Sequence, residues 1–549
     1  MRFERLYTYF LFPFALDSGA IRANHPQEWP RDAKWIEGLD AWIGRPSEGH
    51  ASPAMNRLNP WRRATYTQFD SGSPAYTNLL FFTSIVRHVF FDTNIGRTTD
   101  DEENQLRCYT ISLDPSSRLW FEGADALGRK GRAEVQDLRL FLSAEGVGIL
   151  SIGVAHDGSD AGYALWTNRR LRKLYPVDAD SLQDGRTPNW LAFRLEERGK
   201  QLETVCEEKF ESPQMVRFYP PLPNTIKSLL YFADYTLEEY EPVLDENMLV
   251  YSFAELDAGQ IPPGPASDLD KVGEFLFLGH AHQNAVRYNS PSGTTLIAIT
   301  AHNCSALHVT HSSQCEIGEL IRLYASHPPI ERDELDSWNE FHSHFYLMMV
   351  IACFYRAVLM DFGERSALVA RRLLHDQQAG KLTLASIEMV NRFRTEFLHF
   401  SGYWHFDDVS SKKADNDFFR RICSEYRVDE MKSVLTSELR HMTEFVYNFY
   451  QLRTTEAVNR LALLSLIFGG GAVLTGFFGM NFGREFTRVV FEGQGSSWLH
   501  YLLVFIVTLF VFGSLLLGTI VVLRSWREYF AILNPPRSKG LAPSIKRER

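Results

Sequence analysis

The hydrophobic pattern of this chain of 549 residues changes at about residue 325. Before that point, short apolar runs alternate with turn-forming segments, which is typical of mixed strands and helices. The break at 143–146 between two of these runs predicts a hairpin, and the Gly-, Pro- and Ser-rich stretches Arg45–Arg63 and Gly259–Asp268 predict loops. Ala161–Leu174 is expected to be a helix, and the runs expected to be strands are Tyr7–Leu16, Leu138–Leu142, Val147–Val154, Trp190–Leu195 and Thr295–Thr300.

The first twenty residues superficially resemble a signal peptide, because Arg2 and Arg5 precede an apolar run. Glu4 and Pro13 interrupt that pattern, and the run is rich in aromatic residues. We therefore favour a buried strand over a targeting segment.

From about Glu331 onward the pattern is helical. His344–Phe362 is apolar enough to be read either as a membrane span or as a buried helix. Its marginal length, the charge of Arg356 and its polar flanks favour the buried helix.

A long amphipathic helix is predicted to begin near Val428. Apolar residues recur at i, i+3, i+4 and i+7, and no proline occurs between Val428 and Asn481. One continuous helix of that length would measure about 80 Å at roughly 1.5 Å per residue. The alternative is two helices with a break near Thr454-Thr455.

Two segments near the end of the chain are long and apolar enough to span a bilayer. Leu461–Met480 has no charge, and Trp498–Leu523 follows after a short linker, so together they predict a helical hairpin. The final segment, Arg524–Arg549, holds seven Lys/Arg and two acids. Basic residues at both ends of the hairpin predict that both termini are cytoplasmic and that the linker is external.

Composition narrows the class of protein. The net charge is −10, and because the tail carries +5 (seven bases less two acids), the rest carries −15. An acidic body argues against nucleic acid as a partner and favours cations. The six cysteines form no CxxC pair, and no phosphate-binding glycine loop, GxSxG or HExxH motif occurs. We therefore expect no enzyme activity and no resident cofactor.

The first predicted span ends in Gly479-Met480-Asn481. This string, after a long helix and before a second span and a basic tail, resembles the CorA family of magnesium transporters over roughly Val428–Asn534. The resemblance implies a homopentamer in the lipid bilayer of the cell (plasma or inner) membrane, with the first span lining the pore. Gly479, Met480 and Asn481 would then form a ring whose oxygens accept hydrogen bonds from a hydrated ion.

The resemblance also assigns roles to residues elsewhere. Glu444 would attract cations, although it also suits a solvated stalk, and the external loop retains only Glu485 and Glu492 as acids. Gly469-Gly470-Gly471 stands where family members often carry larger residues. The positions implied for the pore and gate, which ordinary helix packing would also explain, are Val458, Leu461 and Ala472.

The expected fold class is α+β, with a cytoplasmic α/β domain, a long helical stalk and a two-helix transmembrane hairpin. The expected divisions are a sensor-like domain at 1–330, a helical region and stalk at 331–460, a pore-lining helix at 461–482, an external loop at 483–497, a second span at 498–523 and a basic cytoplasmic tail at 524–549.

Other clusters of polar residues are weaker candidates. The spacing of His302, Cys304, His308, His311 and Cys315 fits no standard zinc finger. Acidic residues that could bind regulatory Mg²⁺ are expected to be solvated, and no resident metal site is assigned. These acids are Asp100 to Glu103, Asp407-Asp408, Asp415 and Asp417.

The function predicted from these features is passive transport of divalent cations, with Mg²⁺ first and Co²⁺, Ni²⁺ or Zn²⁺ also compatible. The alternative is a CorA-like membrane effector of a type III CRISPR defence system, in which a small nucleotide messenger would regulate the N-terminal domain. The unusual length of that domain is the only argument for it. A membrane-anchored scaffold without a pore is a third alternative.

Overall fold

The structure is a computed structural model of the whole chain. It describes residues 3–16, 61–64, 79–91, 106–111, 113, 115–125, 127–143, 146–156, 160–173, 190–197, 203–209, 240–242, 247–257, 267–278, 285–310, 325, 329–331, 337–378, 382 and 384–479, and the single positions 498, 502, 505, 509, 513, 516 and 520.

Strands dominate the first part of the chain. They are β1 (Arg5–Leu16), β2 (Arg62–Ala64), β3 (Arg107–Thr110), β4 (Ser117–Ala124), β5 (Lys130–Leu142), β6 (Val147–His156), β7 (Trp190–Glu197), β8 (Glu203–Lys209), β9 (Tyr240–Pro242), β10 (Leu249–Asp257), β11 (Val286–Ser290), β12 (Gly293–Thr300), β13 (Asn303–Thr310) and β14 (Ile330–Glu331). The helices are α4 (Ser84–Phe90), α6 (Ala161–Leu171), α9 (Ser267–Leu276), α11 (Ser337–His342), α12 (His344–Gln378), α13 (Leu384–His399), the π-helix η5 (Phe400–Trp404), α14 (Lys413–Glu425) and α15 (Val428–Gly479).

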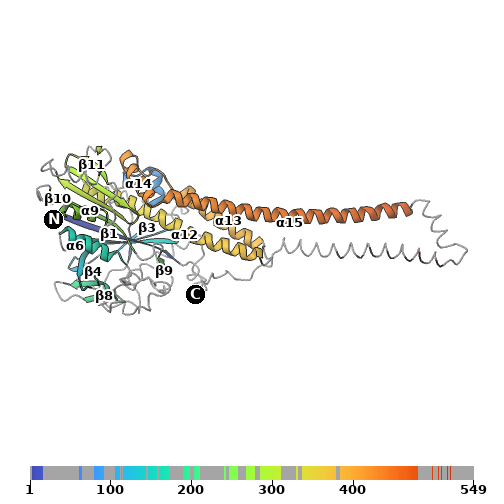
Figure 1. The fold of residues 1–549 in the computed structure, drawn as a ribbon, viewed down its shortest axis with the longest axis horizontal. Helices are drawn as coiled ribbons and strands as arrows, with labels where there is room; N and C mark the ends of the chain where they lie inside the picture. Colours follow the sequence, from blue (N-terminus) through green and yellow to red (C-terminus); the bar gives the residue numbers. More distant parts are fainter. Residues whose placement is uncertain are drawn as a thin grey trace. The chain divides into compact units, whose positions relative to one another are not determined.

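All five predicted strands and the predicted helix before residue 325 are present (Figure 1). The hairpin between β5 and β6 is also confirmed, with Gly146 at a φ of 82° where a side chain would be strained. Each loop prediction was wrong at its end, because Arg62 and Arg63 belong to β2 and α9 begins at Ser267. Residues 45–60 and 259–266 lie outside the described residues. β2 and the first turn of α9 extend into the predicted loops because contacts with neighbouring elements stabilise them, and local composition does not reveal such contacts.

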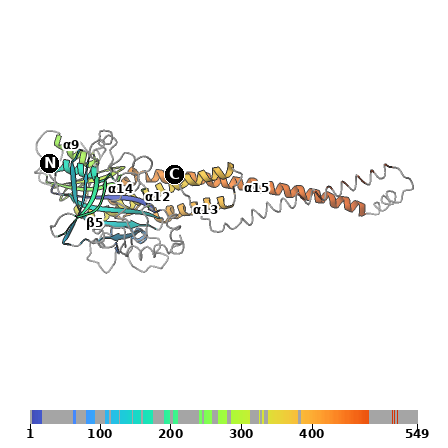
Figure 2. The same ribbon diagram turned by 90° about the horizontal axis from the view of Figure 1, so that it is seen from below.

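Within the described residues the strands form one mixed sheet of 14 strands. Its central path runs β14-β11-β12-β13-β10-β1-β6-β5-β4-β7-β8. The pairs β10–β13 and β11–β14 are parallel, and the other pairs are antiparallel. Figure 2 shows the sheet turned by 90°.

The central strand β1 is buried on both faces, which explains its almost continuous apolar sequence. Its residues Phe10, Phe12 and Phe14 belong to a core cluster with Leu165 and Leu171 of α6. The alternate residues face α11 and α12: the Tyr9 ring lies 4.3 Å from that of Tyr346, and Tyr7 lies 4.6 Å from His342. Helices therefore cover both sides of the sheet.

The buried-strand interpretation of the N-terminus is confirmed, and Pro13 has a structural explanation. Pro13 pairs with Ile149 of β6 on one side. On the other side, pairing with β10 ends at Leu11 and pairing with β9 begins at Phe14. The residue without an N–H group thus lies where, among the described strands, the ladder has a gap.

Two compact units divide the chain. The first comprises Met1–Glu364 and His399–Val434, and the second comprises Arg365–Leu398 and Leu435–Arg549. The second unit includes the later part of α12, most of α13 and most of α15. Its core contains Leu373, Val390, Met442 and Val446, and Ser366 Oγ donates to Glu438 Oε2 at 2.6 Å.

The apolar run in α12 is a buried helix, as the sequence favoured. Of the helices searched in the described chain, one segment, Ser337–Gln378, is long and apolar enough to cross a membrane. However, 83% of its most apolar window is buried inside the protein. Tyr346 and Tyr355 are fully buried, and the Arg356 guanidinium donates to the Ala301 carbonyl and lies 5.0 Å from the Tyr426 ring.

Candidate functional site

The long helix α15 is continuous from Val428 to Gly479, without a break at Thr454-Thr455. Thr454 instead donates its hydroxyl to the Tyr450 carbonyl at 2.9 Å, which satisfies it within the helix. The helix follows α14 after two residues, and Arg427 adopts a φ of 55° at this junction. Asp429 and Glu430 in the first turn complement the positive end of the helix dipole.

The two parts of α15 in the second unit differ in burial. Met442 and Val446 pack in the core of that unit. Beyond residue 450 Leu464 is buried, but other large apolar side chains are exposed: Leu461 is 58% exposed, Leu463 57% and Leu466 76%. Burying a side chain of this size stabilises by about 1.5–3 kcal/mol. A helix with such residues on several faces is expected to lie against lipid or other apolar chains.

The positions assigned to a pore are all described, and all lie on α15. Glu444, Val458, Leu461 and Ala472 are exposed. With about 3.6 residues per turn, these residues fall within roughly 100° of arc. They therefore share one broad face of the helix, as residues around a common axis must.

The glycines of this segment leave its surface open. A Cβ added at Gly469, Gly470, Gly471 or Gly476 would meet nothing within 4 Å. Close approach of another helix needs such small residues.

The Gly-Met-Asn string is only partly described. Gly479 is the last residue of α15, so this helix ends where the motif begins. Met480, Asn481, Glu485 and Glu492 lie outside the described residues. Of the second predicted span, seven separate positions are described, and each is helical and exposed: 498, 502, 505, 509, 513, 516 and 520.

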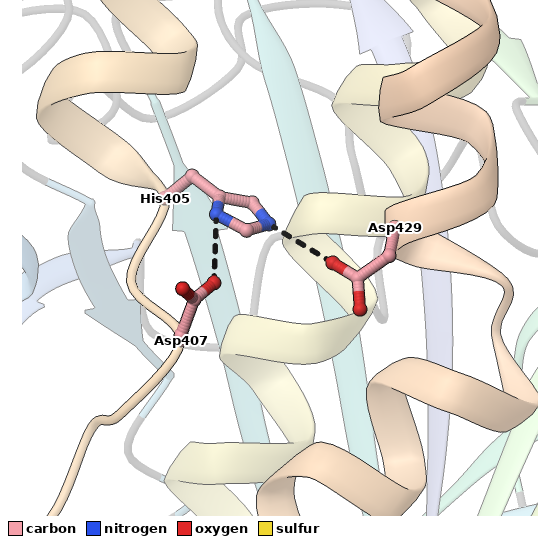
Figure 3. Close-up of side chains that lie close together, drawn as sticks. All are labelled: His405, Asp407 and Asp429. Atoms are coloured by element: carbon pink, nitrogen blue, oxygen red, sulfur yellow. Dashed lines mark ion pairs between the residues drawn. The ribbon is translucent and has the colours of Figure 1, made fainter.

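A second polar group lies where α15 begins, entirely within the first unit (Figure 3). His405 follows η5, Asp407 lies two residues later, and Asp429 is in the first turn of α15. His405 Nδ1 is 3.8 Å from Asp407 Oδ1, and its Nε2 is 3.9 Å from Asp429 Oδ1. The three ligand atoms that these residues offer lie within 4.8 Å of one another.

The His405 ring is held in place. Its side chain is 5% exposed, whereas those of Asp407 and Asp429 are 86% and 80% exposed. The ring stacks on Tyr355, with centroids 4.9 Å apart. Tyr355 is itself fixed, because its hydroxyl donates to the Trp404 carbonyl and accepts from the Phe406 N–H.

A cation already contacts this imidazole. The Lys432 ammonium lies 3.0 Å from His405 Nδ1. Burial, and then the Lys432 charge, lower the pKa of His405, while Asp407 and Asp429 act in the opposite direction. The ring is thus neutral near pH 7, and a neutral ring retains one nitrogen lone pair.

The described members of the histidine and cysteine group around β13 do not come together, in line with their lack of a zinc-finger spacing. Cys304 and His308 are buried on one face of β13, four residues apart, which is about 13 Å at roughly 3.3 Å per residue. His308 Nδ1 instead lies 3.0 Å from Thr295 Oγ1. His302 is exposed beside the strand, and His311 and Cys315 lie outside the described residues, as do the acids from Asp100 to Glu103.

The expectation that the later acids are solvated was correct for Asp407 and Asp408 but wrong for Asp415. The Asp415 side chain is 1% exposed, accepts from Ser410 Oγ at 3.0 Å and lies 3.8 Å from His344 Nε2. Asp415 lies on the face of α14 that packs into the protein. The acidic sequence around it, which includes Asp417, gives no sign of this burial.

Sequence reasoning missed His405 and Asp429 as members of a group. They are 24 residues apart and separated by the whole of α14, so no short motif joins them. The only signal was the adjacent pair Asp407-Asp408 after a histidine.

Comparison with known proteins identifies the region that contains α15. Residues 403–521 match the family model described as CorA-like Mg²⁺ transporter protein. No curated protein matches the chain. Among solved structures, the chain is similar to "The complete structure of CorA magnesium transporter from Methanocaldococcus jannaschii", with 13% identity and a TM-score of 0.20, over 52% of this chain and 91% of that one. A TM-score this low is no evidence of a shared arrangement of domains. The matched stretch holds the whole of α15 and the Gly-Met-Asn string, so this part of the chain is similar to the CorA-like Mg²⁺ transporter family.

Proposed function

We propose that this protein is a passive membrane channel for divalent cations, with Mg²⁺ as the first substrate. The observation that supports this most directly is the end of α15. Its exposed apolar residues lead directly to Gly479, the first residue of the Gly-Met-Asn string, inside the region that matches the family.

The proposed topology is a hairpin of two spans, Leu461–Met480 and Trp498–Leu523, with both termini in the cytoplasm. The helical, exposed positions between 498 and 520 support the second span. One hairpin encloses no aqueous path, so several copies must surround a shared axis, and a homopentamer is the assembly proposed.

Selection would take place at the ring of Gly479, Met480 and Asn481. Mg²⁺ loses its water reluctantly, so neutral amide and carbonyl oxygens that accept hydrogen bonds from bound water suit it. Val458, Leu461 and Ala472 would line the path below the ring, and Glu444 would attract cations toward it. Glu485 and Glu492 are the only acids available to capture ions outside. The membrane potential would supply about 2.3 kcal/mol per charge per 100 mV.

Flux through liposomes tests this proposal. We expect Asn481→Ala to slow Mg²⁺ entry by about tenfold or more, because each subunit loses a hydrogen-bonding group worth roughly 1 kcal/mol. The same substitution at Asn448, an exposed residue of α15, is the matched control and should leave the rate unchanged. Parallel measurements with Co²⁺, Ni²⁺ and Zn²⁺ determine the ion preference.

Two results would contradict the proposal. Equal rates of Mg²⁺ entry for wild type and Asn481→Ala would show that the ring of Gly479, Met480 and Asn481 does not select the ion. A correctly assembled wild-type protein that conducts none of the four ions would refute transport altogether.

A further inference from the structure

We propose that His405, Asp407 and Asp429 form a binding site for a transition-metal dication such as Zn²⁺, which enters by displacing the Lys432 ammonium from His405 Nδ1. The site lies where α15 begins, far along the chain from the Gly-Met-Asn string. It does not depend on the transport proposal, because it uses none of the residues assigned to the pore.

The first argument is that the site combines one rigid side chain with two adjustable ones. His405 is buried and stacked on Tyr355, so its lone pair has a fixed direction. Asp407 and Asp429 are largely exposed and can rotate. Two atoms each about 2.1 Å from one Zn²⁺ lie at most about 4.2 Å apart, and the observed 3.8 Å between Nδ1 and Asp407 Oδ1 already meets that limit.

The second argument is that a cation already occupies this position. Lys432 Nζ lies 3.0 Å from Nδ1, so the ammonium donates a hydrogen bond to Nδ1 and Nε2 carries the ring proton. A dication at Nδ1 would replace one positive charge with two beside the Asp407 carboxylate. The Lys432 side chain is long enough to move away into solvent.

The third argument is the position of Asp429 on the opposite side of the ring, as Figure 3 shows. Its Oδ1 lies 3.9 Å from Nε2, so a small rotation lets it accept the Nε2–H. A carboxylate that accepts a hydrogen bond from the second ring N–H orients a metal-bound histidine and raises its basicity. The proposed ligands are therefore His405 Nδ1 and an Asp407 oxygen, with water completing the shell and Asp429 orienting the ring.

The chemistry of the donors selects the class of ion. Imidazole nitrogen suits Zn²⁺, Ni²⁺ and Co²⁺, whereas Mg²⁺ prefers oxygen ligands. A bound ion would connect the loop after η5 to the first turn of α15. This role differs from transport, in which the ion passes along the other end of the same helix.

Titration calorimetry of the full chain in detergent, with Zn²⁺ as the probe, tests the proposal. We expect His405→Ala to abolish one class of Zn²⁺ site, and Asp407→Asn and Asp429→Asn each to weaken that site by roughly tenfold. Lys432→Met should tighten it, because the competing ammonium is gone. Millimolar Mg²⁺ should leave Zn²⁺ bound.

The control is Asp408→Asn, which removes the neighbouring exposed carboxylate that pairs with Arg420 at 2.6 Å. It should not change Zn²⁺ binding. Asp407→Asn alters a side chain that is 86% exposed, so it tests the site even if His405→Ala fails to fold.

The proposal is overturned if wild type and Asp407→Asn bind Zn²⁺ with the same affinity, or if Lys432→Met binds it no more tightly. Asn481→Ala should keep this Zn²⁺ site, so a failure of the channel proposal and a failure of the metal site are separate results.

Discussion

At the scale of single residues, the pKa values of two partly buried histidines of the first unit lie well below the ordinary value. Burial lowers the pKa of His156 to about 4, and burial with the charge of Arg139 lowers the pKa of His342 to about 4. Each ring has a fixed partner: His156 Nε2 lies 3.0 Å from Thr8 Oγ1, and His342 Nδ1 lies 3.0 Å from Tyr9 Oη. Both rings are therefore neutral in the folded protein well below pH 6.

The pH dependence of stability follows from these shifts. An unfolded histidine takes up a proton below about pH 6.5, while His156 resists protonation down to about pH 4. The contribution of His156 to the free energy of unfolding is therefore complete above pH 6.5 and is lost as the pH falls from 6.5 to 4. For each of the two histidines, the free energy of unfolding should drop by about 2 kcal/mol between pH 7 and pH 5.

Thermal melting across that pH range measures the effect. His156→Gln should reduce the slope of melting temperature against pH by about half, whatever its effect at pH 7. His375→Gln, an exposed side chain in the other unit, should keep the wild-type slope. An identical slope in His156→Gln and wild type would disprove the assignment.

At the scale of elements, two glycines illustrate how the same substitution can have opposite effects. A Cβ at Gly293, at the start of β12, would lie 2.3 Å from the Val309 carbonyl oxygen. The backbone of a central strand cannot move aside cheaply. A Cβ at Gly363, inside α12, would meet nothing within 4 Å.

We expect Gly293→Ala to lower the free energy of unfolding by about 1–3 kcal/mol through overpacking. Gly363→Ala should raise it by up to about 1 kcal/mol, since alanine favours a helix more than glycine does. Denaturant unfolding of each variant decides the matter. If both substitutions changed the free energy of unfolding in the same direction, the packing described around Gly293 or Gly363 would be wrong.

At the scale of the whole molecule, the exposed apolar part of α15 limits how this helix could be oriented in the proposed channel. Leu461 and Leu463 are 58% and 57% exposed, yet two residues apart on a helix they point about 160° away from each other. If Leu461 lines the proposed pore, Leu463 must face lipid or a neighbouring helix.

Leu461→Cys should therefore react with a water-soluble thiol reagent, which should reduce Mg²⁺ flux by half or more, and it should form cross-links between subunits. Leu463→Cys, the matched control, should react slowly and keep its flux. The five described native cysteines are buried. Equal modification of both variants would contradict the proposed orientation of α15.

The sequence alone determined the features that depend on local periodicity and length. The continuous helix from Val428, the strand at the N-terminus and the apolar segment before Gly479 were all predictable, because helix and strand patterns repeat within a few residues. The resemblance to the family rests on a short string in that same local context, and the family match bears it out.

Only the tertiary structure decided which distant residues meet. It buried His344–Phe362 against the sheet, turned Asp415 inward and placed Pro13 at a gap in the ladder. It also brought Asp429 to His405, although α14 separates them in the chain. Such contacts depend on how whole elements pack, and packing is a property of the folded chain that no single segment contains.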